Sequence, residues 1–220
     1  NINGCYCEGC MKRFEEKYGF RYKPEDMKDI NIYKKVLKFK HESIAEFLKD
    51  ARQALKSVNP EAIIYMNGLP LGPSTCGRDN RYCMKYQDAL LAEGGFLYGD
   101  LRQLPVWKPA ASAKLLETQA EGKPTIVAVA GRHGGWSRYL LTAAETWIAY
   151  AMSVANGANV WYGIYDSNRE DERMKTVKEI NSFLSKNSEY LEGTRSDAKI
   201  ALVWSTKNAN FYQTTTEFWD

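Results

Sequence analysis

The chain has 220 residues, of which 44% are hydrophobic and 26% charged, a balance typical of a globular protein that excludes a disordered chain. Lys and Arg number 30 against 27 Asp and Glu, so the net charge of +3 gives no support for a nucleic-acid partner. The longest strongly apolar stretch, around Trp147 to Ala155, is far shorter than the ~20 residues that a membrane helix needs, so we expect no membrane partner.

The chain opens with the pattern C-x-C-x-x-C, formed by Cys5, Cys7 and Cys10 before a predicted helix. Thiolates at this spacing can converge on one tetrahedral zinc, and a helix N-terminus stabilises their charge. The zinc would be structural, and its fourth ligand could be Cys76, Cys83 or a residue that precedes this chain. The alternatives are thiols that bind nothing, or disulfides, against which the odd cysteine count argues. Clustered thiols hold metal best in a reducing compartment, which favours a cytoplasmic location.

Helices and strands alternate along the chain. Apolar spacing and capping residues predict helices over 10–18, 24–28, 32–58, 106–120, 142–155 and 170–184. Apolar runs bounded by turn residues predict buried strands over 62–66, 89–92, 124–130, 159–164 and 199–204. Gly19 is a good C-terminal cap for the first helix, and Thr142 with Glu145 forms a capping box, which explains Glu145 better than catalysis does.

The longest helix is predicted to be amphipathic. Its apolar residues recur at intervals of three and four and predict one buried stripe: Val36, Leu37, Ile44, Phe47, Leu48, Ala51 and Leu55. His41 lies amid charged residues of the same helix, so we expect it to be in solvent.

This order of elements predicts an α/β fold. The strands are apolar throughout, which is typical of parallel strands covered on both faces. An open doubly wound sheet and a (β/α)8 barrel compete, but no G-x-G-x-x-G or Walker motif follows any strand, so nucleotide-binding open sheets lack their usual support. Four βα units would make half a barrel, with two sheet edges and one core face uncovered.

In either arrangement, chemistry lies beyond the carboxyl ends of the strands. The residues predicted there are Asn67, Glu93, Arg132, His133 and Asp166, with the aromatic residues Trp136, Trp161 and Tyr162 near the same rim. Carboxylates among aromatics and amides suit a carbohydrate cleft, because aromatic faces stack on sugar rings and polar side chains bind hydroxyls. Glycoside hydrolysis uses two carboxyl groups, as acid and as nucleophile or base.

Each of these residues also has a purely structural explanation. Glu93 could form an ion pair with Arg132, and His133 in G-R-H-G-G-W could be an ordinary loop histidine. Asp166 could cap the following helix, which is the reading we favour for it, and Trp161 could belong to the core.

Three segments resemble family 42 β-galactosidases and related uncharacterised glycoside hydrolases of the hypothetical glycosyl hydrolase family 6 type, some of them fucosidase-like. N-G-C-Y-C-E-G-C-M-K-R-F-E-E-K-Y-G resembles the segment after the fourth barrel strand, and W-I-A-Y-A-M-S-V-A-N-G-A-N-V-W-Y looks like the seventh helix and eighth strand. A-K-I-A-L-V-W-S-T-K-N-A-N-F-Y is similar to the start of the α/β trimerisation domain that follows the barrel.

The resemblance implies a piece of a longer protein. Residues 1–191 would be the C-terminal part of a (β/α)8 TIM barrel, strands five to eight, and 192–220 a linker and the first strand of a second α/β domain. It further implies a structural zinc on Cys5, Cys7 and Cys10, completed by an upstream cysteine, and a homotrimer by analogy.

The β-galactosidase mechanism does not transfer residue by residue. The acid/base Glu after strand four would precede Asn1, and the nucleophile position after strand seven holds Ala130-Gly131-Arg132-His133, without a carboxylate. The hypothetical family 6 type is therefore the better match.

We therefore expect a glycosidase whose isolated 220 residues are inactive, with Glu93 as one catalytic carboxylate and its partner upstream. The residues expected to line the sugar subsites are Asn67, Arg132, His133, Trp136, Tyr162 and Asp166. The alternatives are a non-catalytic carbohydrate-binding barrel that lost its nucleophile, and a zinc-organised interaction module.

Overall fold

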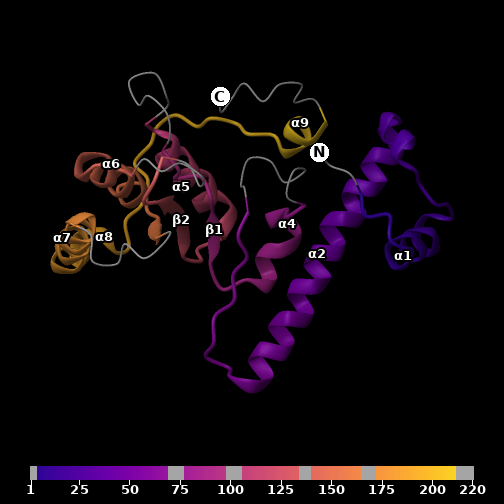
Figure 1. Ribbon diagram of the computed structural model, residues 1–220, viewed down its shortest axis with the longest axis horizontal. Coiled ribbons are helices and arrows are strands. Elements are labelled where there is room, and N and C mark those ends of the chain that lie inside the picture. The colour runs from indigo at the N-terminus through magenta and orange to yellow at the C-terminus, as the bar shows by residue number, and fades with distance from the viewer. Residues whose placement is uncertain (1–3, 69–76, 98–105, 134–139, 165–171, 212–220) are drawn as a thin grey trace.

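The computed structural model describes residues 4–68, 77–97, 106–133, 140–164 and 172–211 (Figure 1). Its elements, in chain order, are α1 (Glu8–Tyr18), the 3-10 helix η1 (Pro24–Lys28), α2 (Ile30–Val58), α4 (Asn80–Cys83), the 3-10 helix η2 (Met84–Tyr86), β1 (Leu90–Ala92), α5 (Lys108–Ala120), β2 (Thr125–Ala130), α6 (Ala143–Val154), β3 (Asn159–Gly163), α7 (Glu172–Lys186), α8 (Ser188–Leu191) and α9 (Thr206–Phe211).

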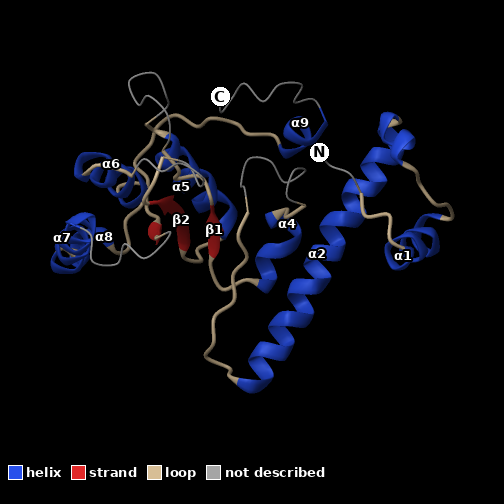
Figure 2. Cartoon of the chain, in the orientation of Figure 1, coloured by secondary structure: helices blue, strands red, loops and turns tan. Residues whose placement is uncertain are grey.

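The described strands form one parallel sheet in the order β1-β2-β3 (Figure 2). Ala92 pairs with Val127, and Ala130 pairs with Gly163, so the carboxyl ends of all three strands lie at the same edge. The α/β class is thus confirmed. The described part contains three strands where four were expected for a half barrel, and barrel closure stays a prediction.

The two faces of this sheet differ. One face packs against α5 and α6 and forms the main core, with Leu90, Val127 and Val129 fully buried. Successive side chains in a strand point to opposite faces. The other face carries Leu91, Ala128 and Ala130, which are also buried, beside Trp161, which is 47% exposed.

A second core joins α1 to α2. Helix α1 begins after Cys7 and ends at Gly19, whose φ of 81° is the left-handed conformation that glycine adopts without strain. The ring of Phe14 lies 4.6 Å from that of Tyr22 and 5.4 Å from that of Phe39. This aromatic cluster is separate from the core beneath the sheet.

The predicted helices are confirmed, with small shifts at their ends, and so are the strands near 89–92, 124–130 and 159–164. The stripe on α2 differs in part, because Phe47 is 64% exposed while His41, expected in solvent, is only 3% exposed. His41 is buried because α4, a short helix that the sequence did not predict, packs against α2. His41 Nδ1 lies 3.6 Å from Asp79, the N-cap of α4.

The strand predicted over 62–66 is an extended segment without a strand ladder, and side chains replace the missing partners. Ile64 N donates to Asp88 Oδ2 at 2.9 Å, and Met66 N donates to Gln87 Oε1 at 2.7 Å. Asp88 N also donates to Ile64 O at 2.8 Å, but β1 begins only at Leu90, so this single backbone bond does not extend into a strand ladder.

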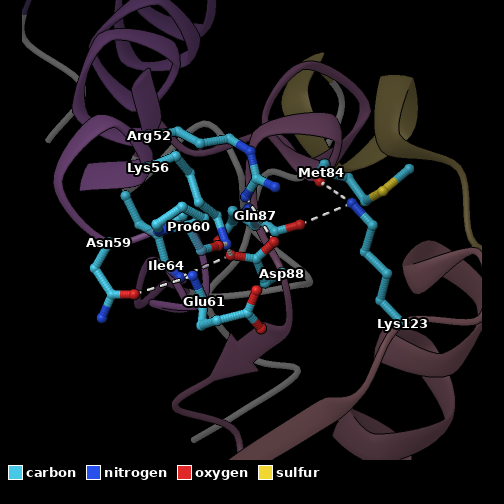
Figure 3. Close-up of polar contacts among 10 residues, drawn as sticks. All are labelled: Arg52, Lys56, Asn59, Pro60, Glu61, Ile64, Met84, Gln87, Asp88 and Lys123. Atoms are coloured by element: carbon cyan, nitrogen blue, oxygen red, sulfur yellow. Dashed lines mark hydrogen bonds and ion pairs between the residues drawn. The ribbon is translucent and has the colours of Figure 1, made fainter. Parts of the chain in front are cut away.

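Asp88 is the centre of this polar network (Figure 3). Arg52 Nη1 donates to its Oδ1 at 2.6 Å, and Lys56 Nζ lies 3.7 Å from Oδ2. Burial alone raises the pKa of Asp88, but the hydrogen bonds from the Ile64 N–H and from Arg52 outweigh it, so that pKa is lowered. Nearby, Lys123 Nζ donates to two backbone carbonyls of the 84–87 turn, at 2.9 and 2.7 Å. The network lies at the amino end of β1.

The strand predicted over 199–204 is also wrong. This segment is extended, but no strand of the described chain pairs with it, and Ile200 and Leu202 are 90% and 95% exposed. The helix α9 that follows packs on α2, where the Phe211 and Tyr33 rings lie 6.0 Å apart. The division of the chain at residue 192 stays a prediction.

Candidate active site

Two chain segments meet at the carboxyl end of β1. Glu93 directly follows this strand and is half-buried. Asn67 Nδ2 donates a hydrogen bond to Glu93 Oε1, and Glu93 N donates to Gly68 O at 3.2 Å. The structure therefore brings together two residues that the sequence predicted at this edge, and it joins them directly.

A second polar pair lies beyond β2. His133 Nε2 is 3.2 Å from Glu145 Oε1, and both side chains are less than one-fifth exposed. Glu145 forms the predicted capping box with Thr142 at the start of α6. Burial alone would raise the pKa of Glu145, but hydrogen bonds from the Thr142 N–H and from His133 outweigh it and lower that pKa. Glu145 thus anchors His133 as an ionised carboxylate.

The aromatic residues of β3 take opposite sides of the sheet. Tyr162 lies on the helix-covered face, with its ring 5.9 Å from that of Tyr150. Its hydroxyl reaches the end of β2, where a Cβ on Gly131 would lie 2.8 Å away. Trp161 faces the other way, beside Ala128. Strand alternation was the signal that could have assigned Trp161 to the face opposite Tyr162.

Of the remaining predicted site residues, the structure describes only Arg132. Arg132 is half-buried and forms an isolated antiparallel bridge with Leu140. Trp136 and Asp166 lie outside the described residues. Arg78 was not predicted as a site residue; it is 2% exposed and donates to backbone carbonyls close to Asn67 and Glu93 in the chain. A lone arginine in a stretch rich in turn residues gave no signal of such a role.

The three N-terminal cysteines form a compact thiol cluster. Their sulfur atoms all lie within 4.8 Å of one another, and Cys5 Sγ is 3.3 Å from Cys7 Sγ. The hydrogen bond from the Cys10 N–H has the largest effect on the pKa of Cys7 and lowers it. Further hydrogen bonds, chiefly from the Cys5 and Cys10 thiols, lower that pKa as well. Burial, followed by the neighbouring thiols, raises the pKa of Cys10 to about 12. Within the cluster, ionisation is therefore easier at Cys7 than at Cys10.

This cluster fits a zinc ion in its donor set. Four thiolates at about 2.3 Å around a tetrahedral zinc lie about 3.8 Å from one another, close to the separations seen here. Cys83 is not the fourth ligand, because it is fully buried between α2 and α4 with Ala45 and Leu48. Cys76 lies outside the described residues.

No protein-family model and no curated protein sequence matches the chain. Among solved structures, a monoclinic crystal form of bee venom hyaluronidase is 12% identical with a TM-score of 0.50, over 81% of this chain and 61% of that one. The same enzyme in complex with a hyaluronic acid tetramer is 11% identical with a TM-score of 0.47, over 81% and 59%.

At this identity the first of these similarities concerns the fold alone, and the fold is glycosidase-like. The chain spans about three-fifths of the hyaluronidase it resembles. Family 42 membership and the homotrimer stay predictions. Within the described residues, we find no helix that combines the length and the apolar character needed to cross a bilayer.

Proposed function

We propose that the chain is part of a glycoside hydrolase-like protein that holds a carbohydrate at the carboxyl edge of β1, β2 and β3, with Glu93 as one of its catalytic carboxylates. The observation that carries this proposal is the Asn67–Glu93 pair at the end of β1. It lies where parallel α/β folds place their chemistry, in a glycosidase-like fold.

The chemistry follows from how Glu93 is held. Asn67 fixes the carboxylate through Oε1, and an oriented carboxylate can serve as nucleophile or as proton donor through its other oxygen. Trp161, which is 47% exposed, offers an aromatic surface of the kind that stacks on sugar rings. His133, held by Glu145, offers a ring nitrogen to sugar hydroxyls.

Two-carboxylate hydrolysis needs a second carboxyl group. Glu145 is a poor candidate, since its oxygens already accept hydrogen bonds from Thr142 and His133. We propose that the second carboxylate comes from a part of the protein outside the described residues, and that residues 1–220 alone do not hydrolyse substrate.

The test is made on the complete reading frame that contains residues 1–220, screened against a panel of aryl glycosides and against hyaluronan. We expect hydrolysis of at least one substrate, lost in Glu93→Gln and kept in the matched control Glu117→Gln, which removes an exposed carboxylate on α5. Normal activity in Glu93→Gln would contradict the assignment.

A non-catalytic carbohydrate-binding protein is the second candidate. The observation in its favour is the end of β2, where Ala130-Gly131-Arg132-His133 offers no carboxylate. Saturable sugar binding by the full protein without hydrolysis of any substrate, unchanged in Glu93→Gln, would support this candidate over the enzyme.

We also propose a structural zinc on Cys5, Cys7 and Cys10, supported by the spacing of their sulfur atoms. A bound zinc would supply a cross-link between the chain start and α1, since Cys10 lies inside that helix. Metal analysis of protein purified without chelator should find one zinc that is lost in Cys7→Ser and kept in Cys83→Ser. Equal zinc content in both variants would contradict the site.

A further inference from the structure

Arg78 is a buried cation that ties the carboxyl ends of two segments together. Its Nη1 donates to Leu91 O at 2.7 Å and also to Met66 O. Leu91 lies two residues before Glu93, and Met66 directly precedes Asn67. One guanidinium nitrogen therefore holds both of the backbone segments that carry the Asn67–Glu93 pair.

Gly68 makes room for this guanidinium. A Cβ at position 68 would lie 2.7 Å from Arg78 Nε and 2.9 Å from Cζ, closer than real Cβ contacts. The carbonyl of the same glycine accepts the hydrogen bond from Glu93 N at 3.2 Å. The packing of Arg78 and the pairing of Glu93 are thus parts of one arrangement.

An arginine suits this role for a chemical reason. Both N–H bonds of one guanidinium nitrogen lie in a fixed plane, so Nη1 can reach two carbonyls at a set angle, which an apolar side chain cannot do. Burying the charge costs free energy that an apolar side chain of similar size would avoid. This cation holds the two backbone segments that carry Asn67 and the candidate catalytic carboxylate Glu93, which indicates that its function is to keep these two residues aligned.

We propose that Arg78 is a positioning residue that sets the register between residues 66–68 and β1, and thereby the alignment of Asn67 with Glu93. The inference deepens the proposed function and rests on it for its catalytic consequence. The alignment itself can be measured without activity.

The experiment follows the Asn67 side-chain amide in ¹⁵N–¹H spectra of the full protein, with its signals assigned by their loss in Asn67→Ala. Glu93→Gln should move these signals, because it replaces the charged acceptor. We expect Arg78→Met and Gly68→Ala to move them too. The matched control is Arg52→Met, which removes a donor to Asp88, the residue that binds the Ile64 N–H, and should leave them in place.

In kinetic assays, Arg78→Met should lower kcat by roughly 10- to 100-fold with little change in KM, the size of effect expected when a reacting group is displaced by about 1 Å. Arg78→Lys, which keeps the charge but not the planar fork, should recover part of the loss. Arg52→Met should leave kcat unchanged.

Unmoved Asn67 signals in folded Arg78→Met would overturn the inference, as would equal shifts in Arg78→Met and Arg52→Met. If Arg78→Met does not fold, Gly68→Ala decides by the same signals, since it keeps the arginine and displaces it. Full activity in Glu93→Gln would refute the proposed function, while the amide signals would still decide the role of Arg78.

Discussion

The two edges of the small sheet hold the same chain segment in opposite ways. At the amino edge, Asp88 accepts from Arg52 and from the Ile64 backbone, and the network is closed on itself. At the carboxyl edge, the same segment ends in Asn67, which binds the half-buried carboxylate of Glu93. The comparison teaches that the amino end of β1 is held by a closed polar network, whereas its carboxyl end keeps its polar groups where a ligand can reach them.

The largest expected effect is a loss of activity on substitution at the carboxyl end of β1. Glu93→Gln should lower kcat by at least ~10³-fold, because it removes a reacting group, and should leave the melting temperature nearly unchanged. Enzyme assays and thermal unfolding of the same samples check this. A strong loss of stability would mean that Glu93 belongs to the structural network instead.

Asp88→Asn should show the reverse. The carboxylate accepts charge-assisted hydrogen bonds at a side chain only 23% exposed, so we expect a loss of about 2 kcal/mol in the free energy of unfolding. Urea unfolding measures the loss. Sugar binding and kcat should not change, and a fall in either would break the distinction between the edges.

The pH dependence of stability should follow Asp88 and Glu145. Their folded-state pKa values lie below the ordinary values of 3.8 and 4.5, so both groups stabilise the fold above those values. This contribution is lost as the pH falls through that range toward the lowered pKa values. Unfolding midpoints measured from pH 6 to pH 3 should decline less steeply in Asp88→Asn than in the unmodified chain.

The smallest effect concerns the start of α6. Thr142→Ala removes a capping hydrogen bond to the Glu145 N–H and should cost about 1 kcal/mol of stability. Because His133 still contacts Glu145 in this variant, sugar binding should persist. Calorimetric titration of Thr142→Ala with a sugar that the unmodified protein binds would show whether sugar binding survives the loss of the cap.

The sequence predicts those elements whose cause is local. The Gly19 cap and the Thr142–Glu145 box each act within one or two turns, and both appear as expected; the helix α2 also forms, although Phe47 of its predicted stripe is exposed. The strand expected over 62–66 failed because its N–H groups bind the side chains of Gln87 and Asp88, and only one backbone bond joins it to residue 88.

The site shows the same limit. Glu93 and Asn67 could be placed at one edge from strand order alone, but their direct hydrogen bond could not. Arg78 escaped prediction because its two acceptors lie 12 and 13 residues away in opposite directions along the chain. Such contacts are fixed by the tertiary fold rather than by local sequence.

The extended segment before α9 has a consequence for handling the protein. Ile200, Leu202 and Val203 are each at least 90% exposed, and an extended apolar segment that pairs with no strand of the described residues is a template for pairing between molecules. Lys199 and Asp197, which pair with each other at 2.5 Å, act as charged gatekeepers at its start. Colloidal stability of the 220-residue chain therefore depends on these few residues, and light scattering should show self-association that Leu202→Lys suppresses.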